Sequence, residues 1–493
     1  MEKHQNSLLS RLSRPVELTA GTPWKVILRY AAPIMLSYLL QQIYVLTDAI
    51  ICGQVLSVGE VAGVNDTYPL TFIFLQFAFG CTGGFGVLTA RYAGCGEKAG
   101  VRRSLVTQIY LSVAISAVLT VLSLLLLPRM LGIIHVTPTN KEVYGAAYIY
   151  CFVIFLGIAA QMGYNFICGI LRSLGDSVTP LLFLVVSTAL NVGLDLLFLL
   201  GFRMGPAGAA IATVVAQLLS MVGCFAYAFF RYPELRPKKT DWRVPFAAMR
   251  AHLQQGIPQG LQFSILAIGI IVMHGAVVKF DLTAGGLMVA NTPAQNGFGA
   301  ANKLVNFLMA GFNGLGTAIL GYNAQNYGKG DFARIRKGTL QSLLLMVGIS
   351  AVCLAAGLLL SIHGAYQYIF MSADKVTPES VRFGNTFLKV DICLYVFLGF
   401  LIVVRAGVQG IGRAGFVLGA GMAELVARVL ICTFLPSWVN GGAIDATASA
   451  LAFAAVCFGD PGAWILASLV ILPPFFRCLL GMRYPEFTSP EKQ

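Results

Sequence analysis

The chain is divided into apolar runs that are each long enough to cross a lipid bilayer. A membrane-spanning helix needs about 20 consecutive apolar residues. Only 11% of the residues are charged, whereas a soluble domain carries about 25%. The pattern therefore predicts an all-α polytopic membrane protein with twelve transmembrane helices. The predicted spans are residues 25–52, 67–91, 104–127, 144–171, 178–200, 207–230, 257–280, 294–324, 338–362, 385–411, 416–436 and 461–480.

The basic residues follow the loops between these runs. The chain has 34 Lys and Arg against 21 Asp and Glu, a net charge of +13. Such an excess would also suit nucleic acid, but the basic residues gather in alternate short connections, among them 91–103, 231–250 and 329–337. Cytoplasmic loops of membrane proteins carry this bias. We therefore predict a multi-pass protein with both termini cytosolic, surrounded by membrane lipids and without nucleic-acid binding.

The two halves of the chain repeat one another. Residues 93–99 match residues 327–333, and residues 169–175 resemble residues 407–412. Because each repeat holds an even number of spans, both repeats have the same orientation in the membrane. We expect two six-helix lobes related by a pseudo-two-fold axis along the membrane normal.

A basic connection that contains three prolines, from Arg231 to Arg250, separates the two sets of six spans. The second half departs from the first over residues 439–458, an alanine-rich insertion for which we predict a short helix at the outer face. The predicted division is a cytosolic tail (1–23), a first lobe (24–231), a cytosolic linker (232–255), a second lobe (256–480) and a cytosolic tail (481–493).

Polar side chains inside the first-lobe spans are the main candidates for function. Asn191 and Asp195 are four residues apart, so they share one face of a helix. An ionised carboxylate at that depth costs several kcal/mol, and such residues commonly mark ion pathways. Asp48 and Thr213 fall at a similar depth on two other spans. The simpler alternatives are an Asp that pairs inside the bundle and a Thr that bonds its own helix.

Two further residues lie on the same helix face as Asp48. Tyr44 precedes it by one turn, and Gln41 precedes it by two turns. We predict that both line a substrate cavity.

The second lobe contains a different polar set. Glu424 and Arg428 are four residues apart in one span, and we predict a structural ion pair that neutralises itself. The alternative is a coupling role for Glu424. Alignment of the repeats places Arg428 opposite Asn191. We place Arg405 at the inner boundary and Asp391 near the wetted outer end of its helix.

No grouping of catalytic residues, phosphate-binding loop or metal-ligand spacing is evident. The sequence therefore favours a protein that is not an enzyme and has no cofactor.

Several motifs together resemble the multidrug and toxic compound extrusion (MATE) family. They are Asn191-x-x-x-Asp195, the stretch 205–213, the turn 171–176 and the segment 324–328. The likeness covers residues 25 to 480 in order, and is greatest to the prokaryotic branch that contains the DNA-damage-inducible F-type and staphylococcal multidrug exporters.

The resemblance implies a secondary antiporter of the bacterial cytoplasmic membrane, which we expect to be a monomer. It would export organic cations or drugs through a V-shaped cavity between the lobes, in exchange for Na⁺ or H⁺ as coupling ion. Four positions match the family's cation site residue by residue, and Na⁺ is a possible ligand there: Asp48, Asn191, Asp195 and Thr213.

Two other classes compete with this hypothesis. A lipid-linked oligosaccharide flippase of the same superfamily would share the helix count and the lobes. Its anionic lipid substrates call for a basic cavity, whereas the polar residues of the first lobe are acidic. A membrane-embedded enzyme would need a nucleophile or a metal cluster, which the sequence does not offer.

Overall fold

The computed structural model describes residues 14–134, 136–372 and 375–481, and its regular structure is helical. The first lobe contains α2 (Pro23–Val55), α3 (Val58–Asp66), α4 (Tyr68–Gly94), α5 (Lys98–Ile133), α6 (Lys141–Leu156), α7 (Ile158–Ser173), α8 (Val178–Asp195), η1 (Leu196–Gly201) and α9 (Pro206–Arg231). The linker contains η2 (Pro233–Leu235) and η3 (Lys239–Trp242). The second lobe contains α10 (Phe246–Val278), η4 (Lys279–Asp281), α11 (Pro293–Lys329), α12 (Phe332–Ser361), η5 (Ile362–Gly364), α13 (Gln367–Phe370), α14 (Pro378–Cys393), α15 (Tyr395–Gly410), α16 (Ala414–Asn440), α17 (Ala450–Cys457), α18 (Gly459–Pro474) and η7 (Phe475–Leu480).

The predicted all-α fold with twelve spans is confirmed. In the described part of the chain, 10 helical segments are long and apolar enough to cross a membrane. Two bent pairs complete the set of 12, namely α6 with α7, at 45°, and α14 with α15, at 51°. The breaks fall at Gly157 and Leu394, at equivalent places in the two lobes.

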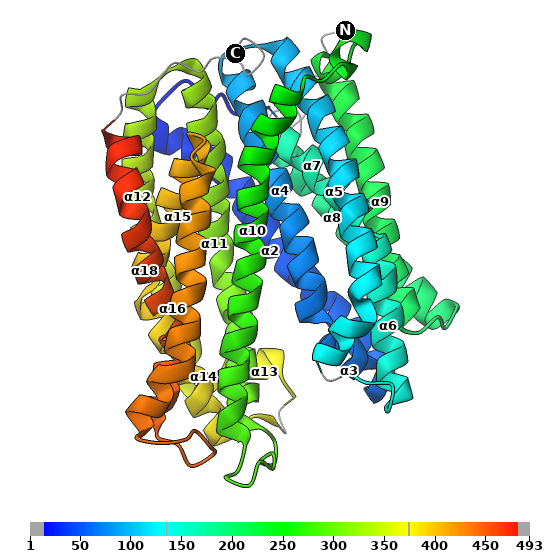
Figure 1. Cartoon of the computed structure of the whole chain (residues 1–493), viewed down its shortest axis with the longest axis vertical. Helices are drawn as coiled ribbons and strands as arrows, with labels where there is room; N and C mark the ends of the chain where they lie inside the picture. Colours follow the sequence, from blue (N-terminus) through cyan, green and yellow to red (C-terminus); the bar gives the residue numbers. More distant parts are fainter. Residues whose placement is uncertain (1–13, 135, 373–374, 482–493) are drawn as a thin grey trace.

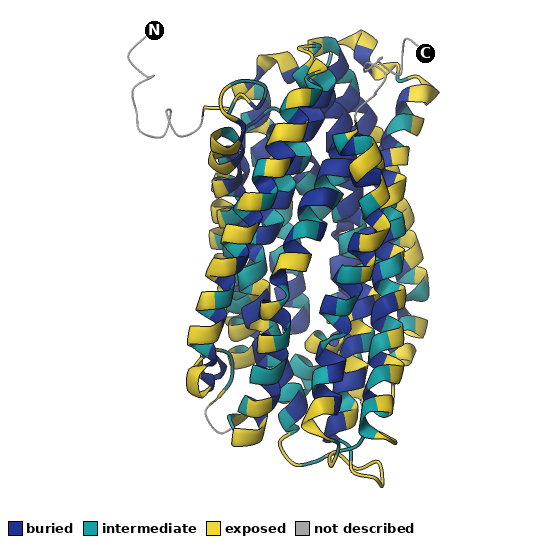
Figure 2. Cartoon of the chain, turned by 90° about the vertical axis from the view of Figure 1, so that its left-hand side faces the viewer, coloured by how far each residue is buried: buried dark blue, intermediate teal, exposed yellow. Residues whose placement is uncertain are grey.

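The outer surface of the bundle is apolar, as contact with lipid requires. Exposed residues follow the outward faces of the helices, while buried residues lie between the helices (Figure 2). Large apolar side chains are among the most exposed, with Leu125 at 73% and Leu344 at 74%. An apolar surface of this extent is not tolerated in water, so these faces belong to the membrane-spanning region.

Glycines with positive φ show that the sequence repeat is also a structural repeat. Gly96 and Gly330, from the first matched pair of motifs, have φ values of 75° and 78°. Gly175 and Gly412, from the second pair, have φ values of 87° and 80°. A left-handed backbone favours glycine because other residues carry a Cβ that crowds the carbonyl. Equivalent turns therefore connect equivalent helices in the two lobes.

The two lobes meet symmetrically where α4 packs against α11. A Cβ at Gly94 would run into the carbonyl of Gln325, and a Cβ at Gly328 would run into the carbonyl of Arg91. In the repeat alignment Gly94 corresponds to Gly328, and Arg91 corresponds to Gln325. The contact is thus the same from both sides, which is the property of an interface on a two-fold axis.

The first helix of each lobe crosses to the other lobe. The first half of α10 lies on α4, where Gly80 and Gly84 face Gly260 and Gly256 so closely that no Cβ would fit. The first half of α2 lies on α11, and the Tyr38 and Thr317 hydroxyls are 3.2 Å apart. Both crossings occupy the half of the bundle nearest the linker, here called the linker end. Toward the opposite end, here called the far end, the helices of the two lobes separate (Figure 1).

The linker is docked on the first lobe. The Asp241 carboxylate accepts hydrogen bonds from the Arg102 guanidinium at 2.9 Å and from the Lys238 backbone N–H at 2.8 Å. Burial raises the pKa of Asp241, but these two donors outweigh it and hold the pKa below its ordinary value. The helix α10 begins at Phe246, so the last ten residues of the predicted 232–255 linker are helical.

The alanine-rich insertion forms part of the last span. A helix does form within residues 439–458, at Ala450–Cys457, but it is mostly buried and continues into α18 as one span, Ala450–Leu480. The Phe453 ring lies 5.1 Å from the Phe280 ring and 4.6 Å from the Phe383 ring. The small alanine side chains allow this close packing, so the last span begins before the predicted residue 461.

Candidate functional site

The four predicted cation-site residues come from three helices of the first lobe. Asp48 lies on α2, Asn191 and Asp195 lie on α8, and Thr213 lies on α9. The Asn191 amide donates toward the Thr213 hydroxyl at 3.4 Å. The Tyr44 hydroxyl lies 3.4 Å from the same Thr213 oxygen. The Thr213 hydroxyl therefore connects α2 and α8 through a shared polar contact.

The carboxyl groups of Asp48 and Asp195 are close enough to interact electrostatically. Asp195 is fully buried and Asn191 is 1% exposed, while Asp48 is half-buried. Within the described residues, neither acid forms an ion pair with Lys or Arg. Two acids thus lie together in the membrane interior without a protein cation.

When both acids are ionised, several buried oxygen atoms of this cluster have no hydrogen-bond donor among the described residues. They are one carboxylate oxygen of Asp48, both carboxylate oxygens of Asp195 and the amide oxygen of Asn191. A buried acceptor without a donor costs free energy, which a bound proton or cation would offset. Carboxylate and amide oxygens are ligands for hard cations. These carboxylate and amide oxygens therefore suit the binding of Na⁺ or a proton.

The local backbone places these side chains. The α-helix α8 ends at Asp195, and a π-helical turn, η1, begins at the next residue. Wider turns of this kind recur at functional sites because they redirect side chains from the regular spacing. The helix α9 then begins at Pro206 after Gly205, whose φ of 60° lets the chain reverse. The apolar sequence of η1 gave no sign of the π-helical turn.

Two neighbours of the cluster were not predicted. Tyr150 on α6 and Cys52 on α2 both lie within electrostatic range of Asp48. Tyr150 has no polar residue beside it on its own helix that would have drawn attention to it. Of the two predicted cavity residues, Tyr44 joins the cluster through Thr213. Gln41 is exposed, and its side chain makes no hydrogen bond within the described residues.

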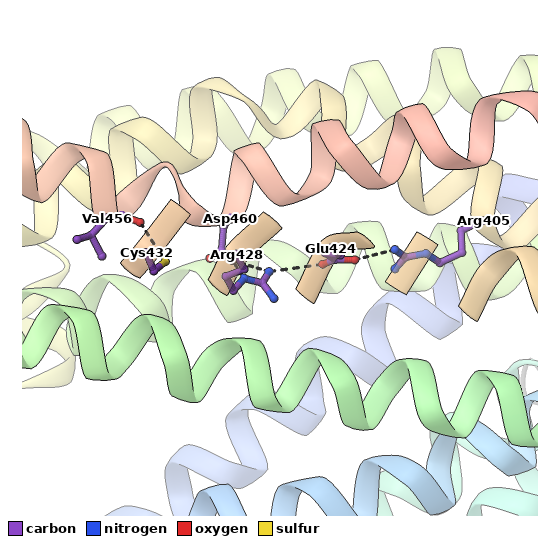
Figure 3. Close-up of polar contacts among 6 residues, drawn as sticks. All are labelled: Arg405, Glu424, Arg428, Cys432, Val456 and Asp460. Carbon is purple, nitrogen blue, oxygen red and sulfur yellow. Dashed lines mark hydrogen bonds and ion pairs between the residues drawn. The ribbon is translucent and has the colours of Figure 1, made fainter. Parts of the chain in front are cut away.

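The polar residues of the second lobe form a chain of alternating charges (Figure 3). Arg405 Nη2 lies 2.7 Å from one Glu424 oxygen, and Arg428 Nη2 lies 3.4 Å from the other. Arg428 also contacts Asp460, with Nη2 2.5 Å and Nε 2.7 Å from the same oxygen. The predicted i,i+4 pair is thus the longest contact of a larger network.

The structure adds a partner to one predicted charge of this lobe and corrects another. Arg405, which we placed at the inner boundary, pairs with Glu424, although the two residues are 19 positions apart. Asp391 is not wetted but fully buried. It precedes the break between α14 and α15, where the packing of α17 and α18 covers it; the sequence position alone suggested a helix end near water.

Comparison with known proteins identifies the family. The family model described as MatE matches residues 33–197 and 286–434, which is more than half of the chain. The chain belongs to the MATE family of membrane transporters.

Individual relatives agree with this assignment over most of their length. The probable multidrug resistance protein YpnP of Bacillus subtilis is 29% identical over 86% of this chain and 88% of its own length. The DNA damage-inducible protein F of Escherichia coli is 25% identical over 71% of this chain and 74% of its own length. A crystal structure of a MATE protein in complex with MaL6 superimposes with a TM-score of 0.81 at 20% identity, covering 95% of this chain and all of that one. As expected for this family, the protein is a transporter and not an enzyme.

Proposed function

We propose that this MATE transporter exports organic cations in exchange for a coupling cation, Na⁺ or H⁺, that binds at Asp48, Asn191, Asp195 and Thr213. The observation that carries the proposal is the difference in pairing between the acids. Asp48 and Asp195 lie together and have no Lys or Arg partner among the described residues, whereas Glu424 and Asp460 each contact an arginine. Asp391 of the second lobe also lacks such a partner, but the acid near it, Asp460, is bound by Arg428. An acid without a fixed cation partner is free to take a mobile one.

The same two acids account for the substrate class. Curated relatives include the multidrug export protein MepA of Staphylococcus haemolyticus, 22% identical over 83% of this chain. A cationic drug near Asp48 and Asp195 would be attracted by their charge. The exposed Gln41 and the half-buried Tyr44, on the same face of α2, would border such a substrate. The acidic cluster does not suit the anionic head groups that a lipid-linked oligosaccharide flippase would carry.

Exchange follows from competition for the two carboxylates. When Na⁺ or H⁺ from outside neutralises them, the attraction for a bound organic cation weakens and the drug leaves. Return of the ion to the cytosolic side then restores the charge for the next drug. The coupling is reciprocal, so the drug must weaken ion binding by the same factor.

Reconstituted vesicles test this function and distinguish the ions. Efflux of an ethidium-like cation is measured in proteoliposomes under an imposed Na⁺ gradient or an imposed proton gradient. At least one of the gradients should drive efflux. If neither does so in folded protein, cation-coupled drug export is wrong.

The hydroxyl of Thr213 sharpens the choice between the ions. Thr213→Val removes an oxygen ligand, so it should weaken Na⁺-driven efflux about tenfold while proton-driven efflux changes little, because a proton needs only a carboxylate. Thr188→Val is the matched control, since the Thr188 hydroxyl donates to the carbonyl of Leu184 in its own helix at 2.9 Å. Equal effects of the two substitutions would exclude Thr213 as an ion ligand.

A further inference from the structure

Residues 16–21, here called the strap, lie across the linker end of the bundle just before α2. The side chain of Leu18 is fully buried and belongs to the apolar core of the second lobe, together with Tyr322 and Ile335. Glu17, the preceding residue, is exposed. The strap is therefore anchored by one apolar side chain while part of its backbone faces water.

Charged side chains of the second lobe hold the strap backbone. The Arg334 guanidinium on α12 donates to the carbonyls of Leu18 at 3.3 Å, of Ala20 at 2.6 Å and of Gly21 at 2.5 Å. Hydrogen bonds from a charged donor are stronger than those between neutral groups. Two residues of α11 add further donors, with Asn326 bonding the Leu18 carbonyl and Lys329 bonding the Thr19 carbonyl.

The other end of the strap touches the first lobe. The Val16 N–H donates to the carbonyl of Gly175 at 2.9 Å, in the turn that follows α7. The approach is so close that a Cβ at Gly175 would run into the Val16 carbonyl oxygen. The strap thus joins α12 of one lobe to the end of α7 in the other.

The end of α7 receives two more contacts of the same kind. The Gln325 side chain of α11 donates to the Ser173 carbonyl at 2.8 Å. The Tyr30 hydroxyl, on the half of α2 that packs against the second lobe, donates to the Arg172 carbonyl at 2.6 Å. The last carbonyls of a helix have no partner within the helix, so they are ready acceptors for such donors. The contact between Gln325 and Ser173 joins the two lobes directly and must break if they part at the linker end, and the other two must break wherever the strap and the first half of α2 stay with the second lobe.

We propose that the strap is a gate for the linker end, and that Arg334 is the positioning residue that holds it closed against α7. The strap has several hydrogen bonds to the second lobe and one to the first. It therefore moves with the second lobe when the lobes separate, and the contact between Val16 and Gly175 is the one that opens. Transport requires this contact to break and re-form in each cycle, whichever ion is coupled.

Limited proteolysis measures the gate without any transport assay. A glutamate-specific protease can cut between the exposed Glu17 and the buried Leu18 only when the strap leaves its site, and mass spectrometry identifies the new N-terminus at Leu18. In folded full-length protein, wild type should be cut slowly. Arg334→Gln should be cut about tenfold faster, since the charged donor is lost. Arg336→Gln, which removes an exposed charge on the same helix, should behave as wild type.

Substitution at the first-lobe contact tests the gate from the other side. Gly175→Ala places a methyl group against the Val16 carbonyl. Gly96→Ala is its matched control, because Gly96 has a similar positive φ of 75° but no neighbour within 4 Å of the added carbon. Cleavage after Glu17 should rise in Gly175→Ala and not in Gly96→Ala.

A role in gating also predicts that the maximal efflux rate changes while drug affinity does not. Arg334→Gln should change the maximal efflux rate several-fold while drug affinity and the melting temperature stay near the wild-type values. Three results would each overturn the proposal: cleavage of Arg334→Gln at the wild-type rate, equal cleavage of the two glycine variants, or a fall in melting temperature that accounts for the faster cleavage.

Discussion

The two lobes have the same arrangement of helices but differ in how their buried acids are paired. In the second lobe each acid of the network has a guanidinium partner, with Arg405 and Arg428 on either side of Glu424. In the first lobe, Asp48 and Asp195 lie near each other with no such partner among the described residues. The fold accommodates both arrangements, and we propose that a mobile cation binds where two unpaired acids lie together. Asp391 of the second lobe also lacks a Lys or Arg partner among the described residues, but the acid near it, Asp460, is bound by Arg428.

The contrast is sharpest at two positions that the repeat makes equivalent. Asn191 on α8 aligns with Arg428 on α16. The first carries an amide whose oxygen has no donor within the described residues, and the second carries a cation bound to Asp460. In the second lobe a fixed arginine neutralises the buried acids, whereas in the first lobe a transported ion would do so.

The largest expected effect comes from neutralising an unpaired acid. Asp48→Asn should lower gradient-driven efflux by about 100-fold, because the site loses the charge that drug and ion share. Stability should hold or rise by up to about 1 kcal/mol, since a buried charge without a partner is costly. The measurement is efflux in proteoliposomes beside the melting temperature in detergent. Normal efflux in this variant would remove Asp48 from the site.

Removing a paired acid should have the opposite effect, with a loss of stability and little change in efflux. Glu424→Ala leaves Arg405 without an acid partner among the described residues, while Arg428 keeps Asp460, and should cost about 3–5 kcal/mol of stability. Combining it with Arg405→Ala should recover part of that loss, and a double-mutant cycle on thermal unfolding measures the recovery. Efflux per folded molecule should change little. If Glu424→Gln abolishes transport without loss of stability, the second lobe also carries coupling charge and the comparison fails.

The symmetry of the lobe interface predicts matched effects of two substitutions. Gly94→Ala and Gly328→Ala each force a methyl group against a backbone carbonyl across the contact of α4 with α11. Overpacking of this kind costs about 1–3 kcal/mol. The two variants should lose similar amounts in thermal unfolding, with Gly348→Ala, which meets nothing within 4 Å, as control. A large loss in one variant alone would show that the contact is not symmetric.

The smallest expected effect concerns the linker. Because the folded-state pKa of Asp241 lies below its ordinary value, its stabilisation is complete above the unfolded pKa of about 3.9 and is lost as the pH falls through the folded pKa. Asp241→Asn should therefore cost about 1 kcal/mol near neutral pH. The difference from wild type, followed by thermal unfolding against pH, should shrink below about pH 4. A constant difference across that range would exclude this charge interaction.

Helix number and repeat could be predicted from the sequence because they depend on local patterns. The length of an apolar run predicts a span, and glycines such as Gly96 and Gly330, which have positive φ, mark the turns whose sequence repeats in the two halves. The helix period also placed Asn191 and Asp195 on one face. The grouping of these residues with Asp48 and Thr213 was predicted from depth, and their contacts agree with it. That they bind an ion is still a prediction.

Contacts between distant segments could not be predicted in the same way. Asp460 lies 32 residues from Arg428, and the sequence contains nothing that distinguishes it from a surface acid at a helix start. The burial of Asp391 depends on how α17 and α18 pack, which depth along a helix does not reveal. The strap is a short stretch of mixed polarity before the first span, and its place in the fold comes from the burial of Leu18 and from bonds to distant residues such as Arg334.

We propose that drug and coupling ion compete for the unpaired acids of the first lobe. Equilibrium binding of an ethidium-like cation to the purified transporter tests this competition, measured against pH and against Na⁺ at constant ionic strength. Affinity should fall as the pH drops or as Na⁺ rises, because either change neutralises Asp48 and Asp195. Asp195→Asn should flatten that dependence, whereas Arg336→Gln should not. If wild-type affinity is indifferent to both ions, direct competition at this cluster is wrong.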